Sequence, residues 1–100
     1  MKEYILLMHS DTTRAVDASS WSTYFAALNA KGIFEGGSAI GAGESMRRDA
    51  ASAPASDHLA GYIRVRAADL QEAKALVSGN PVYEAGGTVE IRELPREPRE

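Results

Sequence analysis

The chain has 100 residues, which is enough for one domain with a single core and too few for two. Its net charge of -3 argues against a surface for nucleic-acid phosphates, and the absence of cysteine excludes disulfides and thiol catalysis. No apolar run approaches the roughly 20 residues that cross a bilayer, and residues 1–3 lead into an expected strand without a secretory signal, so we predict a cytoplasmic protein.

The first third of the chain predicts a strand, a helix and a second strand. Residues 2–9 contain the continuous apolar run Tyr4 to Met8, which is typical of a strand buried on both faces. An apolar stripe at helical spacing predicts a helix over about residues 18–31, ended by Gly32. That stripe consists of Trp21, Tyr24, Phe25 and Leu28. The second strand begins at residues 33–37 and runs into glycine.

The rest of the chain predicts a long connection and a strand–helix–strand unit. Residues 44–57 are rich in alanine, serine and proline, and unstructured connections of this length are often functional. Residues 61–67 alternate between apolar and polar, as a half-buried strand does. Asp69 caps a helix whose apolar stripe begins at Leu70 and which ends at residues 78–79. Residues 88–94 form the last strand, and residues 95–100 are predicted to be a disordered tail.

This order of elements predicts the fold class. The pattern β-α-β-β-α-β is typical of the α+β class and of a ferredoxin-like antiparallel sheet with two helices on one face. In that topology the first and third strands are adjacent and central, which suits the doubly apolar first strand. We therefore predict one domain over residues 1–94.

Three segments resemble proteins of the YCII-related family, also called DGPF-domain proteins. They are residues 1–8 with Ser10 and Asp11, then residues 61–65 with residues 69–73, and finally residues 80–92. The likeness covers most of the chain and is best from Leu59 onward. It implies a ferredoxin-like subunit that pairs into a dimeric α+β barrel, and a histidine–aspartate pair is proposed to act in the namesake branch. This chain lacks the Asp-Gly-Pro-Phe signature and carries residues 55–59, Ala-Ser-Asp-His-Leu, in its place.

His9 and Asp11 are the candidate catalytic residues. Histidine titrates near neutral pH, and a neighbouring carboxylate fixes its tautomer and raises its basicity. At positions i and i+2 of an extended strand the two side chains point to one face. The alternative is a histidine at a strand end followed by an aspartate that forms a turn.

His58 stands at the place of the missing signature, where it can close over a cleft from the long connection or simply be solvated. The spacing of His9 and His58 matches no metal-binding motif, so we predict no metal and no cofactor.

The third and fourth strands place polar residues on one sheet face. Candidate ligand-binding residues there are Tyr62, Arg64 and Arg92, with Arg66 and Glu90 beside them. Arginine forks grip carboxylates and phosphates, so this face can hold a small anionic molecule. The alternative is a set of cross-strand ion pairs.

The central first strand offers apolar side chains to the same face, which a single subunit would leave in water. An apolar strip with a polar rim is typical of an interface, so we predict a homodimer, sheet to sheet, with a cleft between this face and the long connection.

Two functions follow: a small-molecule-binding homodimer with His–Asp acid–base chemistry, or a non-catalytic dimeric module for a ligand or protein. RNA binding is not expected, because only Tyr4 and Tyr62 could stack on bases and the chain is acidic.

Overall fold

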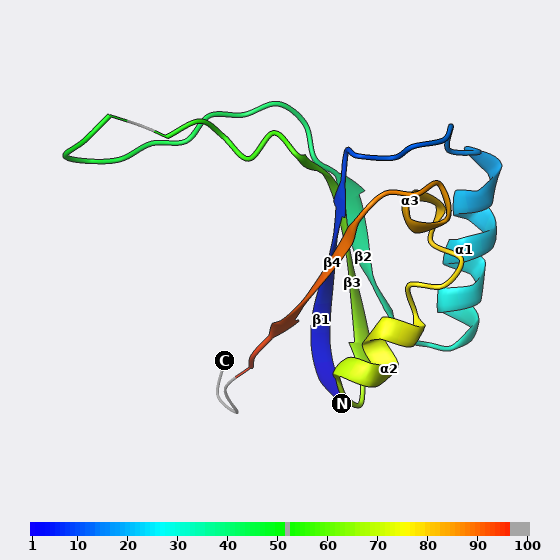
Figure 1. The fold of residues 1–100 in the computed structure, drawn as a ribbon. Helices are drawn as coiled ribbons and strands as arrows, with labels where there is room; N and C mark the ends of the chain where they lie inside the picture. The colour runs from blue at the N-terminus through cyan, green and yellow to red at the C-terminus, as the bar shows by residue number, and fades with distance from the viewer. Residues whose placement is uncertain (52, 97–100) are drawn as a thin grey trace.

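The computed structural model describes residues 1–51 and 53–96. Within these ranges the chain is an α+β protein, with a four-stranded antiparallel sheet and helices packed on one of its faces (Figure 1). The elements in chain order are β1 (Lys2–His9), α1 (Ser19–Ala30), β2 (Phe34–Ala39), β3 (Leu59–Ala67), α2 (Leu70–Ala75), α3 (Pro81–Glu84) and β4 (Val89–Leu94). None of the helices in the described ranges has the length and apolarity needed to cross a bilayer.

The strand order is β2-β3-β1-β4, which confirms the prediction that β1 and β3 are adjacent and central. β1 is antiparallel to both of its neighbours, and Leu7 lies opposite Tyr62 on β3 and Glu90 on β4. This register brings residues from the two ends of the chain onto one surface.

The two faces of β1 have different surroundings. Tyr4, Leu6 and Met8 are buried beneath the helices, whereas Ile5 and Leu7 point to the opposite face and are only half-buried. A single chain therefore buries one face of β1 rather than both, because helices cover only one side of the sheet (Figure 1). We call the uncovered side the open face. It carries every second residue of each strand, and from β1 these are Glu3, Ile5, Leu7 and His9.

The predicted second helix is shorter than expected. α2 ends at Ala75, a turn leads to Gly79, and the four-residue helix α3 follows, which the sequence did not predict. Leu70 is 50% exposed, so its assignment to the buried stripe was wrong. It stands at the first helical position after the cap Asp69, and Ala73 is the buried residue of this helix.

Asn80 and Tyr24 fasten α3 and the turn before it to the core. The Asn80 side chain is fully buried, and its Oδ1 accepts hydrogen bonds from the Val82 and Tyr83 amides at 3.0 and 3.2 Å. The Tyr24 hydroxyl donates to the Leu76 carbonyl at 2.7 Å, and burial raises the pKa of this tyrosine. These bonds satisfy polar groups that the helix ends would otherwise leave buried and unpaired.

Gly86 is a position where only glycine fits, and its replacement gives a testable prediction. Its φ is +85°, and an added Cβ would lie 2.1 Å from Thr13 Oγ1. Gly79 has a similar φ of +89°, but a Cβ there meets only Tyr24 Cδ1 at 3.7 Å. Both alanine variants should lose about 1–2 kcal/mol for the left-handed backbone. The clash with Thr13 should make the loss of unfolding free energy clearly larger in Gly86→Ala than in Gly79→Ala, as measured by urea unfolding. Equal losses in the two variants would contradict this prediction.

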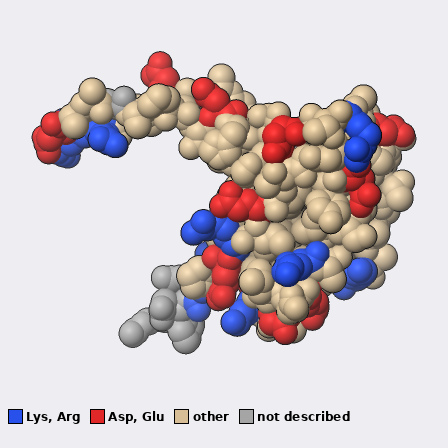
Figure 2. Space-filling model, viewed as in Figure 1, with Lys and Arg blue, Asp and Glu red and all other residues tan. Residues whose placement is uncertain are grey.

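Residues 40–51 and 53–58 join β2 to β3 without helix or strand, as a long extension that we call the arm. It leaves the end of the sheet on the side of the open face, away from the helices (Figure 1). Figure 2 shows it standing clear of the body, with a hollow between the arm and the sheet. The radius of gyration is 15.1 Å, against about 13 Å for a compact chain of this length.

Part of the predicted C-terminal tail is tied to the sheet. Arg96 donates to Glu3 Oε1 at 3.1 Å. The rest of the predicted tail, residues 97–100, lies outside the described residues.

Candidate functional site

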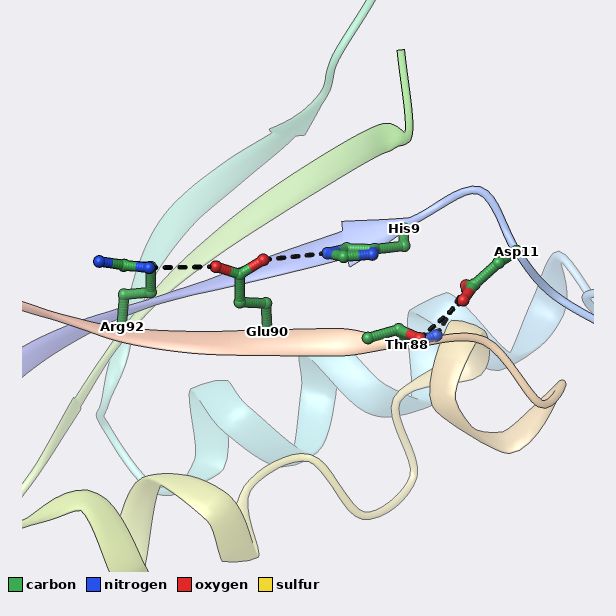
Figure 3. Close-up of polar contacts among 5 residues, drawn as sticks. All are labelled: His9, Asp11, Thr88, Glu90 and Arg92. Atoms are coloured by element: carbon green, nitrogen blue, oxygen red, sulfur yellow. Dashed lines mark hydrogen bonds and ion pairs between the residues drawn. The ribbon is translucent and has the colours of Figure 1, made fainter. Parts of the chain in front are cut away.

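Polar residues gather where β1 ends beside the start of β4. His9 is the last residue of β1, and its Nε2 lies 3.1 Å from Glu90 Oε1 (Figure 3). The His9 side chain is 19% exposed and that of Glu90 is 37% exposed, so the pair is reachable from solvent but largely fixed. The His9 amide donates to the Thr88 carbonyl at 2.9 Å, which holds the two strands together at this point.

Glu90 determines which nitrogen of His9 carries the proton. The hydrogen bond from His9 holds the pKa of the Glu90 carboxyl below its usual range, and Arg92, whose Nη1 lies 3.3 Å from Oε2, acts in the same direction. Glu90 is therefore ionised at neutral pH and can only accept hydrogen bonds. Nε2 of His9 must be the donor, which leaves Nδ1 as the basic nitrogen of the neutral ring.

This assignment gives a prediction for Glu90→Gln. In the unaltered chain, neutral His9 should be almost entirely the Nε2–H tautomer. A neutral glutamine offers either an acceptor oxygen or a donor amide, so the variant should show both tautomers. Long-range ¹⁵N–¹H NMR spectra of the imidazole at neutral pH measure the ratio. Unchanged tautomer populations in Glu90→Gln would show that the carboxylate does not orient the ring.

Asp11 is not the hydrogen-bond partner that the sequence predicted for His9. Its carboxylate accepts from the Thr88 amide at 2.8 Å and from the Thr88 hydroxyl at 2.6 Å (Figure 3). The expected side-by-side arrangement needs an extended chain through residue 11, but the strand ends at His9 and the Ser10 amide turns to bond the His58 carbonyl. Asp11 therefore fixes the start of β4 and shapes the site indirectly.

The Asp11 contacts predict a pH-dependent contribution to stability. The two hydrogen bonds from Thr88 lower the pKa of the Asp11 carboxyl. A carboxyl with a lowered pKa in the folded state contributes stability above its unfolded pKa of about 3.9 and loses it as the pH falls through the folded value. Asp11→Asn should therefore be less stable than the unaltered chain at neutral pH, and the difference should shrink in acid. The urea midpoints of both proteins, measured at neutral pH and in acid, test this prediction. A difference in stability between the two proteins that does not change with pH would contradict it.

The side chains of His58, at the end of the arm, and His9, at the end of β1, lie in contact. Their ring centroids are 4.9 Å apart at an interplanar angle of 70°, an edge-to-face contact. His58 is exposed and is held by the bond between its carbonyl and the Ser10 amide at 2.8 Å. In the described part of the chain, no group of three or more histidine, aspartate or glutamate side chains is arranged to hold a metal.

The arginines of the open face are engaged with carboxylates. Arg64 Nε lies 3.5 Å from Glu3, and Arg66 Nε lies 2.6 Å from Glu35. Arg92 pairs with Glu90 and keeps a side chain that is 68% exposed. The structure thus contains the cross-strand ion pairs that were one reading of this face, each worth about 0.2–1 kcal/mol in water. Tyr62 lies opposite Leu7, between Arg64 and the end of the sheet at which His9 ends β1.

A cleft that the sequence did not predict lies on the helix side of the sheet. It has a volume of about 790 Å³ and runs between α1 and the β2–β3 edge, so it is not the cleft expected between the open face and the long connection. The stacked rings of Trp21 and Phe25, with centroids 5.4 Å apart, form one wall. Gly36 and Gly37 bring no side chains to β2, which leaves these rings partly uncovered. The glycines at the end of the predicted second strand are the sequence feature that could have indicated this cleft.

A family model described as the YCII-related domain matches residues 4–96, a range that includes most of β1, all of β2, β3 and β4, and the His9–Glu90 pair. No curated protein matches the chain.

Proposed function

The chain belongs to the YCII-related domain family, and we propose that it acts as a homodimer that binds a small organic anion and uses His9 for acid–base chemistry. The hydrogen bond between His9 and Glu90 carries this proposal. A part-buried imidazole fixed by an ionised carboxylate is the arrangement that general acid–base catalysis uses.

The open face supports the proposed dimer. Ile5, Leu7 and Tyr62 form an apolar strip across the two central strands, and in one chain they stay half-exposed. Charges of both signs surround the strip: Glu3, Glu35 and Glu90 with Arg64, Arg66, Arg92 and Arg96. Such a face is self-complementary, because a second copy can bury the strip and meet opposite charges at its rim. The helices cover only the other side of the sheet, which leaves the open face accessible to a second copy.

The chemistry follows from the tautomer of His9. Nδ1 accepts a proton from an acidic C–H or O–H of the bound molecule, and the imidazolium that forms is stabilised by Glu90. The same imidazolium then returns a proton to the substrate, so the base is regenerated without another reactant. Arg92 is the proposed anion holder because its guanidinium is the most exposed of the arginines on β3 and β4 and lies next to Glu90.

A non-catalytic dimeric ligand- or protein-binding module is the second candidate. The arginine–glutamate pairing favours it, because paired charges specify an interface as readily as they bind a ligand.

Pyruvate and inorganic phosphate are suitable probes, since both are small anions and pyruvate is also a carbon acid. Either anion should shift the amide NMR signals of Glu90 and Arg92 saturably, and Arg92→Gln should weaken this response. Lys74→Gln on α2 is the matched control, which should leave it unchanged. In D₂O the protein should accelerate hydrogen–deuterium exchange at the pyruvate methyl group, and His9→Gln should abolish the acceleration while binding persists.

The outcomes separate the two candidates. Binding that depends on Arg92, without exchange that depends on His9, would reject the acid–base role and support the non-catalytic module. An open face that neither anion perturbs would reject the anion site itself.

A further inference from the structure

In the part of the chain that the structure describes, the arm makes no hydrogen bond or ion pair with the helices or with β4. Its two roots are held at Ile40 and at His58, whose carbonyl accepts from the Ser10 amide. Between these roots, the hydrogen bonds described for it are internal or join it to the start of β3: Ser45 to Ala53, Asp57 to Ala55, and Leu59 to Ser56. Met46 is 89% exposed. Connections of this length inside a compact domain are uncommon unless they serve a function, because ordering them costs conformational entropy that buried contacts must offset.

The arm projects from the side of the sheet on which the proposed second copy would lie. In Figure 1 it leaves the ends of β2 and β3 opposite the helices, and Figure 2 shows the hollow that it borders. Two sheets packed face to face lie about 10 Å apart, whereas the outgoing leg from Ile40 to Arg48 reaches up to about 30 Å when extended. The arm is therefore long enough to pass the partner's sheet.

Symmetry determines which part of the partner the arm meets. A two-fold axis that runs along the strands reverses the strand order, so β2 and β3 of one copy face β4 and β1 of the other. This axis also brings Leu7 opposite Tyr62 of the partner, because both stand at the same height in the register. The arm begins on β2 and β3 at the end of the sheet where His9 ends β1 and Thr88 precedes β4.

We propose that the arm of each copy crosses the strand ends of the other and forms a wall of its His9–Glu90 site. The inference rests on the proposed homodimer. In one chain this site is bounded by Thr88, Asp11 and His58, and the Glu90 side chain stays 37% exposed. The second copy's arm would cover this side chain and exclude water from the imidazole, so each site is complete only in the pair.

The absence of cysteine makes a direct test possible. Gly43 lies on the outgoing leg with open space around its Cα, so Gly43→Cys accepts a nitroxide spin label. Spin-labelled chain without ¹⁵N is mixed with ¹⁵N-labelled chain without the spin label, so that any broadening arises between copies. Broadening is expected at the amides of Ser10, Asp11 and Thr88, and not at Glu3 at the opposite end of β1. Lys74→Cys, labelled on α2, should broaden none of these signals.

Sedimentation of the same mixture separates the possible failures. A dimer whose broadening is absent, or confined to the Glu3 end, would overturn the crossing arm and leave the proposed dimer standing. A monomer would overturn both.

Discussion

Leu7→Asp is expected to convert the protein into a folded monomer. Leu7 is at the centre of the apolar strip of the open face and lies opposite Tyr62 and Glu90 in the sheet. In the proposed dimer an aspartate there would be buried without a cation and beside the Glu90 carboxylate, in both copies. A cost of at least about 4 kcal/mol for the pair corresponds to a dissociation constant raised by about 1,000-fold or more.

Sedimentation equilibrium measures this effect, and circular dichroism shows whether the variant is folded. Leu70→Asp is the matched control, because it makes the same substitution at a residue that is 50% exposed at the start of α2. An acidic residue in the first turn of a helix is favourable, so this variant should keep both fold and dimer. A Leu7→Asp chain that remains fully dimeric would show that the open face is not the interface.

Leu6→Ala should produce a large loss of folding stability. Leu6 is fully buried in the central strand, beneath the helices. Truncation of a buried leucine removes its transfer free energy and leaves a cavity, which together cost about 3 kcal/mol or more. Urea unfolding followed by circular dichroism measures the loss.

Leu7→Ala is the informative comparison, because it is the same truncation one residue along and on the opposite face. Its effect should shrink as the protein is diluted, because it acts on association and the unaltered chain also dissociates at low concentration. The Leu6→Ala loss lies in the fold of each chain and should persist at every concentration. Equal losses with the same concentration dependence in the two variants would mean that the two faces of β1 are not distinct in the way described here.

Much of the fold could be predicted from local patterns. The aromatic stripe of α1 and the alternation of residues 61–67 are short-range signals, and both elements form where they were expected. The α2–α3 region was harder, because Asn80 ends one turn and caps the next helix through its own side chain. A buried asparagine that caps a four-residue helix has no periodic signature.

The sequence predicted which residues belong to the candidate site better than it predicted which of them contact each other. His9 and His58 meet, 49 positions apart in the chain, because the arm returns to the sheet beside the end of β1. Glu90 was assigned to the polar face but not to His9, since that pairing depends on the register between β1 and β4. Neighbouring positions in the sequence favoured Asp11, and the end of the strand removed it from that role.

Sedimentation velocity of the unaltered chain measures whether a second copy covers the open face. At about 10 µM, about tenfold above a micromolar dissociation constant, we expect one species with the mass of two 10.7-kDa chains. A single species with the mass of one chain, at this and higher concentrations, would leave Ile5, Leu7 and Tyr62 facing water and would overturn the proposed dimer.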